Sequence, residues 1–171
     1  MKRNDNKCFS NSYRGLTVLT AVLLAVCLIP SSLSAQTLEL DYSTYLGGSA
    51  REEGWGIALG TGGAVYITGY TDSSDFPTEN PSQAGSGGNS DVFVSCLGSA
   101  GSTLIYSTYL GGSDFDSGYA LARGTAGAVY LTGYTDSADF PTETPFQAGY
   151  GGDGDVFVSR LGSSGSSLLY S

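Results

Sequence analysis

The sequence predicts an all-β protein made of β-propeller blades, which are four-stranded antiparallel sheets that pack face to face. Residues 42–105 return as residues 106–169, with 44 identities over 64 positions and no gap. Each copy holds four short apolar runs separated by turn residues, a pattern typical of a small antiparallel sheet. Apolar side chains fall on both faces of these runs, and such strands are covered on both faces. Repeated units that cover one another indicate a propeller.

Two other repeat architectures fit less well. The chain has 26 glycines, and its mature part lacks apolar residues at helical spacing, so an α-solenoid is excluded. The glycines cluster at turns instead of recurring every third residue, which excludes collagen. A parallel β-helix stays open, although its coils are much shorter than 64 residues.

Residues 1–35 are predicted to be a secretory signal peptide. A basic leader precedes the apolar run 16–29 and Pro30, and small residues follow, with cleavage expected after Ala35. The apolar run is shorter than the ~20 residues that span a bilayer, so a retained anchor is the weaker reading. Lipidation at Cys27 is weaker still, because Val26 is bulky for a lipobox. We therefore expect bacterial export to the cell surface or the medium.

The remaining chain divides at the repeat boundaries. Residues 36–53 are expected to form a strand that completes a preceding blade, residues 54–111 the first blade and residues 112–171 the second. Tyr170-Ser171 begins a third copy in register, which indicates a truncated array. Strands are expected at 104–110, 119–123, 128–134 and 156–161, and from 168.

A long polar connection separates the second and third strands of each copy, at 71–90 and 135–154. It contains Asp75-Phe76-Pro77-Thr78, for which we expect a fixed kink with Phe76 beneath the loop. Long loops are often functional. Because both copies carry nearly the same loop, a structural staple between blades is an equal alternative.

Charge and cysteine content exclude several classes of function. Outside the predicted leader there are 15 acidic and 3 basic residues, a balance that repels nucleic acid and anionic membranes. It is compatible with divalent cations. Cys96 is the single cysteine outside the leader, so no disulfide framework is possible. We expect Cys96 to be a small buried side chain near a strand end.

The sequence has no histidine, which excludes His-based triads and His-ligated metals. Carboxylate pairs of the glycosidase kind could be drawn from four aspartates, Asp72, Asp75, Asp136 and Asp139. A pair repeated in every blade is unusual for a single active site, because catalytic groups normally have differing environments. No catalytic residue is therefore predicted, and the protein is not expected to be an enzyme.

Calcium is a stronger candidate than catalysis. Asp114 and Asp116, and likewise Asp153 and Asp155, lie two residues apart beside glycine, a spacing that oxygen-ligand loops use. The full calcium-loop pattern is absent, and aspartate with glycine also makes plain turns. We therefore predict no cofactor or metal-binding residue, with calcium as the open alternative.

Aromatic residues recur at equivalent positions of the repeat: Tyr42, Tyr45, Trp55, Tyr106, Tyr109 and Tyr119. They could form a rim on which a carbohydrate stacks. Tyrosines at repeated strand positions more often fill the space between blades, with their hydroxyls at the edge. Packing is the favoured interpretation.

Five spaced motifs resemble the bacterial SBBP β-propeller repeat over nearly all of residues 38–171. They are Tyr-Ser-Thr-Tyr-Leu-Gly-Gly, Val-Tyr-Leu-Thr-Gly-Tyr-Thr-Asp-Ser, Asp-Phe-Pro-Thr, Phe-Gln-Ala and Asp-Val-Phe-Val-Ser-Arg-Leu. The first copy departs from this pattern at 81–84, which lacks the Phe before Gln, and 50–53 replaces the acidic 114–117. The resemblance implies exported or cell-surface propellers with many tandem blades, usually without an assigned activity.

The favoured function is an exported, non-enzymatic scaffold or binding and adhesion module, which contacts a protein or carbohydrate through loops at one end of its blades. One alternative is a fragment of a polysaccharide lyase or hydrolase whose catalytic blades lie elsewhere, and another is a structural spacer. Two blades cannot close a ring of about four to eight. The isolated fragment is therefore expected to self-associate through its exposed edges and faces.

Overall fold

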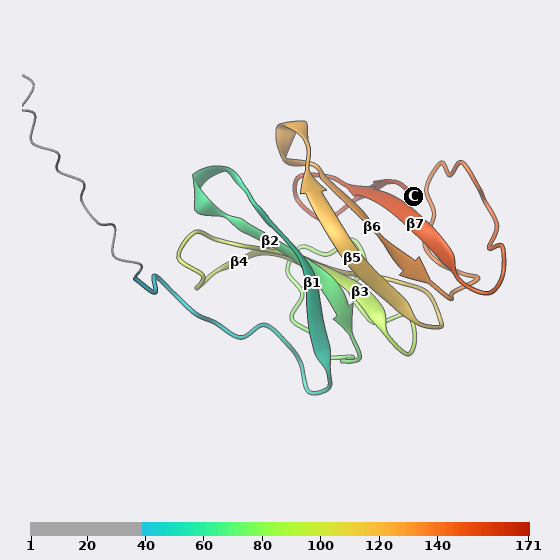
Figure 1. The fold of residues 1–171 in the computed structure, drawn as a ribbon, viewed down its shortest axis with the longest axis horizontal. Helices are drawn as coiled ribbons and strands as arrows, with labels where there is room; N and C mark the ends of the chain where they lie inside the picture. The colour runs from blue at the N-terminus through green and yellow to red at the C-terminus, as the bar shows by residue number, and fades with distance from the viewer. Residues whose placement is uncertain (1–38) are drawn as a thin grey trace, which may run out of the picture. The chain divides into compact units, whose positions relative to one another are not determined.

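A computed structural model of the chain describes residues 39–171, and residues 40–171 form one compact unit. The predicted signal peptide, its cleavage site and Cys27 lie outside the described residues. The all-β prediction is confirmed: the chain folds into two four-stranded antiparallel sheets, each formed by consecutive strands (Figure 1). Among residues 39–171 no helix has the length and apolar character needed to cross a membrane.

The two sheets have the same strand order and nearly the same registers. The first contains β1 (Glu52–Leu59), β2 (Val65–Thr71), β3 (Asp91–Leu97) and β4 (Leu104–Leu110). The second contains β5 (Asp116–Arg123), β6 (Val129–Thr135), β7 (Asp155–Leu161) and β8 (Leu168–Tyr170). Short 3-10 turns at Thr61–Gly63 and Thr125–Gly127 join the first two strands of each sheet. The predicted strands are confirmed to within a few residues, with the largest difference at β5, which begins at Asp116 and not at 119.

Each sheet has two faces, because side chains alternate along a strand. We call the face of Val65, Ile67 and Phe93 the leading face, and the face of Tyr66, Val92 and Val94 the trailing face. The same names apply to the second sheet at positions 64 residues further on. The main core lies where the trailing face of the first sheet meets the leading face of the second. It contains Tyr66, Val92, Val94, Cys96, Tyr106, Leu110, Val129, Leu131, Phe157 and Leu161.

The sequence predicts that both faces of each strand are buried. This is so only where the other sheet packs on the face. Every residue of β3 is buried, as expected for a strand that is apolar on both faces. In β7 buried and exposed residues alternate, and Val156 and Val158 on the trailing face are exposed. The expectation is wrong for this face among the described residues, because no sheet packs on it. Cys96 is buried and free, as predicted.

The long loop after β2 covers the outer edge of its own sheet. Glu79 exchanges two backbone hydrogen bonds with Ser107 of β4, and Tyr109 N donates to Gln83 O. Phe76 lies under the loop as predicted, against Phe93 and Tyr109, with ring centroids 4.8 and 6.0 Å away. The loop is therefore mainly a staple within one sheet.

The same loop also reaches the next sheet. Ser90, at its end, forms a parallel bridge with Phe115, and Asp116 N donates to Ser90 O at 2.9 Å. The predicted staple between repeats is thus a single bridge at the end of the loop. In the second copy the equivalent loop also bonds its own sheet, since Ser171 N donates to Glu143 O.

Candidate functional site

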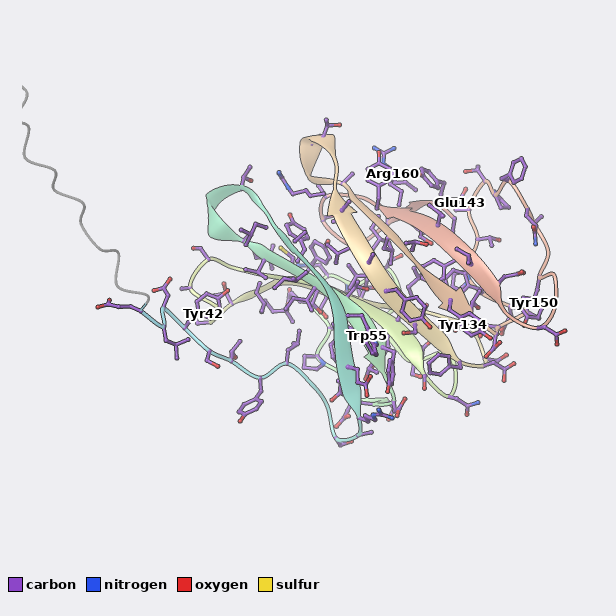
Figure 2. All side chains as sticks on the ribbon, viewed as in Figure 1. Tyr42, Trp55, Tyr134, Glu143, Tyr150 and Arg160 are labelled. Atoms are coloured by element: carbon purple, nitrogen blue, oxygen red, sulfur yellow. The ribbon has the colours of Figure 1, made fainter. Side chains whose placement is uncertain are left out.

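An exposed aromatic pair lies where the first strands of the two sheets come together. Trp55 of β1 and Tyr119 of β5 are 57 % and 51 % exposed. Their ring centroids are 6.4 Å apart and their planes meet at 81°, an edge-to-face arrangement. Figure 2 shows Trp55 near the centre of the molecule, beside β1 and β5. The two rings form a right-angled corner with large apolar surfaces open to solvent.

Both aromatic residues occupy the same position of the repeat, and a β-bulge places them there. The register shifts between Gly54 and Gly56 in β1, and the shift recurs on either side of Tyr119 in β5. A bulge sets two residues against one on the partner strand, so the extra residue is left unpaired. At the bulge the backbones of β1 and β2 lie so close together that β2 needs glycine at position 69. A Cβ on Gly69 would lie 1.8 Å from Glu53 O.

The other predicted aromatic positions divide by environment. Tyr106 and Tyr109 are fully buried, so packing is confirmed for them. Tyr106 lies between the sheets as predicted, whereas Tyr109 packs beneath the loop of its own sheet, and the hydroxyls of both are buried and not at the edge. Tyr42 is half-buried and lies against Gly101, as Tyr106 lies against Gly165. Tyr45, the counterpart of Tyr109, is fully exposed. Only Trp55 and Tyr119 of the six meet as an exposed pair.

Two of the four aspartates considered for glycosidase chemistry, Asp75 and Asp139, bind neighbouring turns. Asp75 accepts hydrogen bonds from Ser49 N at 2.8 Å and Ser49 Oγ at 2.9 Å, and Asp139 accepts the same two from Ser113. These bonds hold the pKa of both aspartates below its usual range.

Asp72 and Asp136 occur in equivalent places but bond differently. Asp72 accepts from Ser90 Oγ at 2.5 Å, whereas Asp136 accepts from Tyr134 OH at 2.6 Å. The carboxylate of Asp136 raises the pKa of Tyr134 to about 12. Asp75 and Asp139 thus fasten equivalent turns, whereas the bonds of Asp72 and Asp136 differ between the two copies.

The calcium candidates are not brought together. Asp114 and Asp153 are exposed, Asp155 accepts a hydrogen bond from Gly151 N, and Asp116 is fully buried. Among residues 39–171 no three acidic, cysteine or histidine side chains converge in a way that could hold a metal ion.

Two buried aspartates from different sheets instead lie near each other beside Gly111, an arrangement the sequence did not indicate. An ideal Cβ on Gly111 would lie 2.1 Å from Asp91 Oδ1 and 2.8 Å from Asp116 Oδ2. Both aspartates are fully buried, and the Oδ1 atom of each has no hydrogen-bond partner. Burial raises the pKa of Asp91 and of Asp116, and hydrogen bonds from Ser86 and Ser137 partly oppose this. The first copy has Glu52 in place of Asp116. Aligning the two copies therefore does not reveal that Asp91 and Asp116 lie near each other.

A cavity of about 370 Å³ opens beneath the loop of the second copy, beside β7 and β8. Its walls combine polar and small residues with five aromatic residues, Phe140, Phe146, Tyr150, Phe157 and Tyr170. Figure 2 shows Tyr150 on this loop, close to Tyr134 of β6. In the first copy Tyr109 occupies the equivalent space against Phe76 and Phe93.

Comparison with known protein families finds no matching family model, and comparison with curated proteins finds no significant match. The resemblance to the SBBP repeat stays a prediction.

Proposed function

We propose that the chain is an exported, non-enzymatic repeat scaffold whose sheets are propeller blades and whose exposed aromatic corner binds carbohydrate. The observation that carries this proposal is the pairing of Trp55 and Tyr119 at one position of consecutive repeats. A position that is aromatic and exposed in each copy adds nothing to the core. It does supply rigid apolar surfaces with a polar ring atom at the rim, as stacking ligands require.

Three further features support a binding scaffold over the alternatives. Asp75 and Asp139, two of the four aspartates considered for catalysis, are engaged in fastening turns. The acidic mature chain suits an exported protein. The bulges recur at the same place in both sheets, so the backbone presents the two rings as one surface. The proposed ligand is a neutral polysaccharide, because anionic glycans would be repelled by the net negative charge.

Trp55 is the only tryptophan of the chain, so its fluorescence reports on the proposed site directly. Titration with soluble neutral glucans, galactans and chitin oligosaccharides should give a saturable change in emission for at least one of them. Tyr119→Ala should weaken that binding about tenfold, because loss of an aromatic contact together with its buried apolar area costs ~1.5 kcal/mol. Tyr45→Ala removes an exposed tyrosine outside the pair and is the matched control. A panel without any saturable response would reject the proposal.

Export is tested separately. When the whole chain is expressed in a bacterium, the protein recovered outside the cytoplasm should begin at Gln36. Retention of residues 1–35 would contradict the predicted signal peptide, and a lipid on Cys27 would show the lipoprotein alternative to be correct.

A further inference from the structure

Asp91 and Asp116 form a buried pair of carboxylates where the first sheet meets the second. Asp91 begins β3 and Asp116 begins β5, and the side chains of both are 0 % exposed. The Oδ2 atom of each accepts hydrogen bonds from nearby loop residues, whereas the Oδ1 atom of each accepts none. A buried carboxylate oxygen without a partner is costly. The pair is therefore a site for a group that carries positive charge.

Two backbone carbonyl oxygens lie beside the same carboxylates. A Cβ built on Gly87 would lie 2.6 Å from Gly112 O and 2.8 Å from Gly111 O. The same Cβ would lie 3.2 Å from Asp91 Oδ1, and a Cβ on Gly111 would meet Asp91 and Asp116 together. No backbone N–H group in the described part of the chain donates to either carbonyl oxygen. Glycine at positions 87 and 111 thus keeps carbon out of a cradle lined by oxygen atoms.

The protein supplies no cationic side chain to this pair. Within residues 39–171 the one salt bridge joins Arg51 to Glu53. Two buried carboxylates without a basic partner carry two negative charges when both are ionised. A single shared proton would leave one of these charges buried, whereas a divalent cation balances both.

The chemistry of the donor atoms selects among divalent cations. Carboxylate and carbonyl oxygens suit calcium and magnesium, while zinc and copper prefer nitrogen and sulfur ligands. Magnesium gives up its water molecules reluctantly and needs near-ideal octahedral geometry. Calcium accepts irregular sets of oxygen ligands, backbone carbonyls included. A fully buried site with two carboxylates and two carbonyls therefore favours calcium.

We infer that Asp91 and Asp116 bind one calcium ion between the two sheets, with the carbonyl oxygens of Gly111 and Gly112 as further ligands. Asp116 belongs to one of the calcium pairs expected from the sequence, but its partner comes from the other sheet and not from Asp114. The site has two acidic ligands and not three, and the ion joins the sheets near the single bridge that the loop makes between them. Carbohydrate binding at the aromatic corner is independent of this site.

The test is isothermal titration calorimetry of the chelator-treated chain with calcium chloride, up to about 10 mM, the weak end of the range for extracellular calcium sites. Wild type should bind one calcium ion per chain. Asp91→Asn and Asp116→Asn should each weaken binding at least about 100-fold, because calcium affinity depends on the charge of the ligands. Magnesium should bind at least about tenfold more weakly than calcium.

Asp155→Asn is the matched control. Asp155 holds the same position of the repeat as Asp91, and it accepts from Gly151 N as Asp91 accepts from Gly87 N. It is only half-buried and lies outside the proposed site. This variant should bind calcium like wild type.

Thermal melting with and without calcium separates a ligand from a merely structural aspartate. In the presence of a chelator at neutral pH, Asp116→Asn should melt at or above the temperature of wild type, because the substitution removes a buried charge. With saturating calcium the order should reverse, since only wild type gains stability from the ion. Loss of stability in Asp116→Asn by the same amount under both conditions would overturn the inference.

The remaining outcomes are equally decisive. Absence of calcium binding by wild type would show that a proton and not a metal ion satisfies the pair. Unchanged calcium binding in both Asp91→Asn and Asp116→Asn would place any bound ion elsewhere, and equal binding of magnesium would overturn the assignment to calcium.

Discussion

Val92 and Val156 occupy equivalent positions in the two sheets, yet Val92 is fully buried and Val156 is 77 % exposed. The leading faces differ in the opposite direction, because Leu131 is buried and its counterpart Ile67 is only half-buried. The local sequence and the strand register are nearly the same in both sheets. The difference comes from which neighbour is present, so the stability of each repeat depends on the interface it shares.

The largest expected difference between equivalent residues is at Tyr109 and Tyr45. Tyr109→Ala removes a buried ring and two hydrogen bonds and should lower the free energy of unfolding by ~3–5 kcal/mol. Tyr45→Ala changes an exposed side chain and should alter it by ~0.5 kcal/mol or less. Urea denaturation at a concentration where the chain is monomeric compares the two variants. Equal losses at both positions would show that the repeats are equivalent in solution.

A second comparison concerns Asp116 and its dependence on pH. The native pKa of Asp116 and of Asp91 is raised by burial, so the folded state binds protons more readily than the unfolded state does. Stability from these groups is present at low pH and is lost as pH rises through the native pKa. The free energy of unfolding should therefore increase when pH falls from neutral toward mildly acidic values.

Asp75 and Asp139 act in the opposite sense, since their native pKa is lowered. Their contribution disappears on stronger acidification, so the profile should pass through a maximum. In Asp116→Asn the initial rise should shrink, because a neutral amide needs no proton. An unchanged rise in this variant, measured by urea denaturation at several pH values, would assign the effect to other groups.

The smallest expected effect compares two turns. Gly62 and Ala126 are equivalent, and both adopt a positive φ, of 67° and 55°. Glycine tolerates this conformation, whereas alanine is strained there. Ala126→Gly should raise the free energy of unfolding by ~0.5–1 kcal/mol, and Gly62→Ala should lower it by ~1–2 kcal/mol. Thermal melting of both variants checks the opposite signs, and shifts of the same sign would contradict the strain argument.

Local features of the fold could be predicted from the sequence because their causes are local. Turn residues and short apolar runs located the strands, and the fixed φ of Pro77 placed Phe76 beneath its loop. Burial of Cys96 followed from its place within an apolar strand. These predictions need no knowledge of a neighbouring sheet.

Features that depend on the neighbour could not be predicted in the same way. The exposure of Val156 follows from what packs on the trailing face, and the Asp91–Asp116 contact joins residues of different sheets. The aromatic corner depends on the bulges. Glycine at 54 and 69 leaves room for a bulge, but glycine alone does not predict that one forms there. The repeated aromatic position was visible in the sequence, but its exposure was not.

The loop that lies along β4 has a genetic consequence. Glu79 and Gln83 occupy backbone groups of β4 that an outermost strand would otherwise offer to foreign chains. Each unit carries its own loop, so an in-frame duplication of the 64-residue unit would add a β4-type edge that is already protected from pairing with foreign strands.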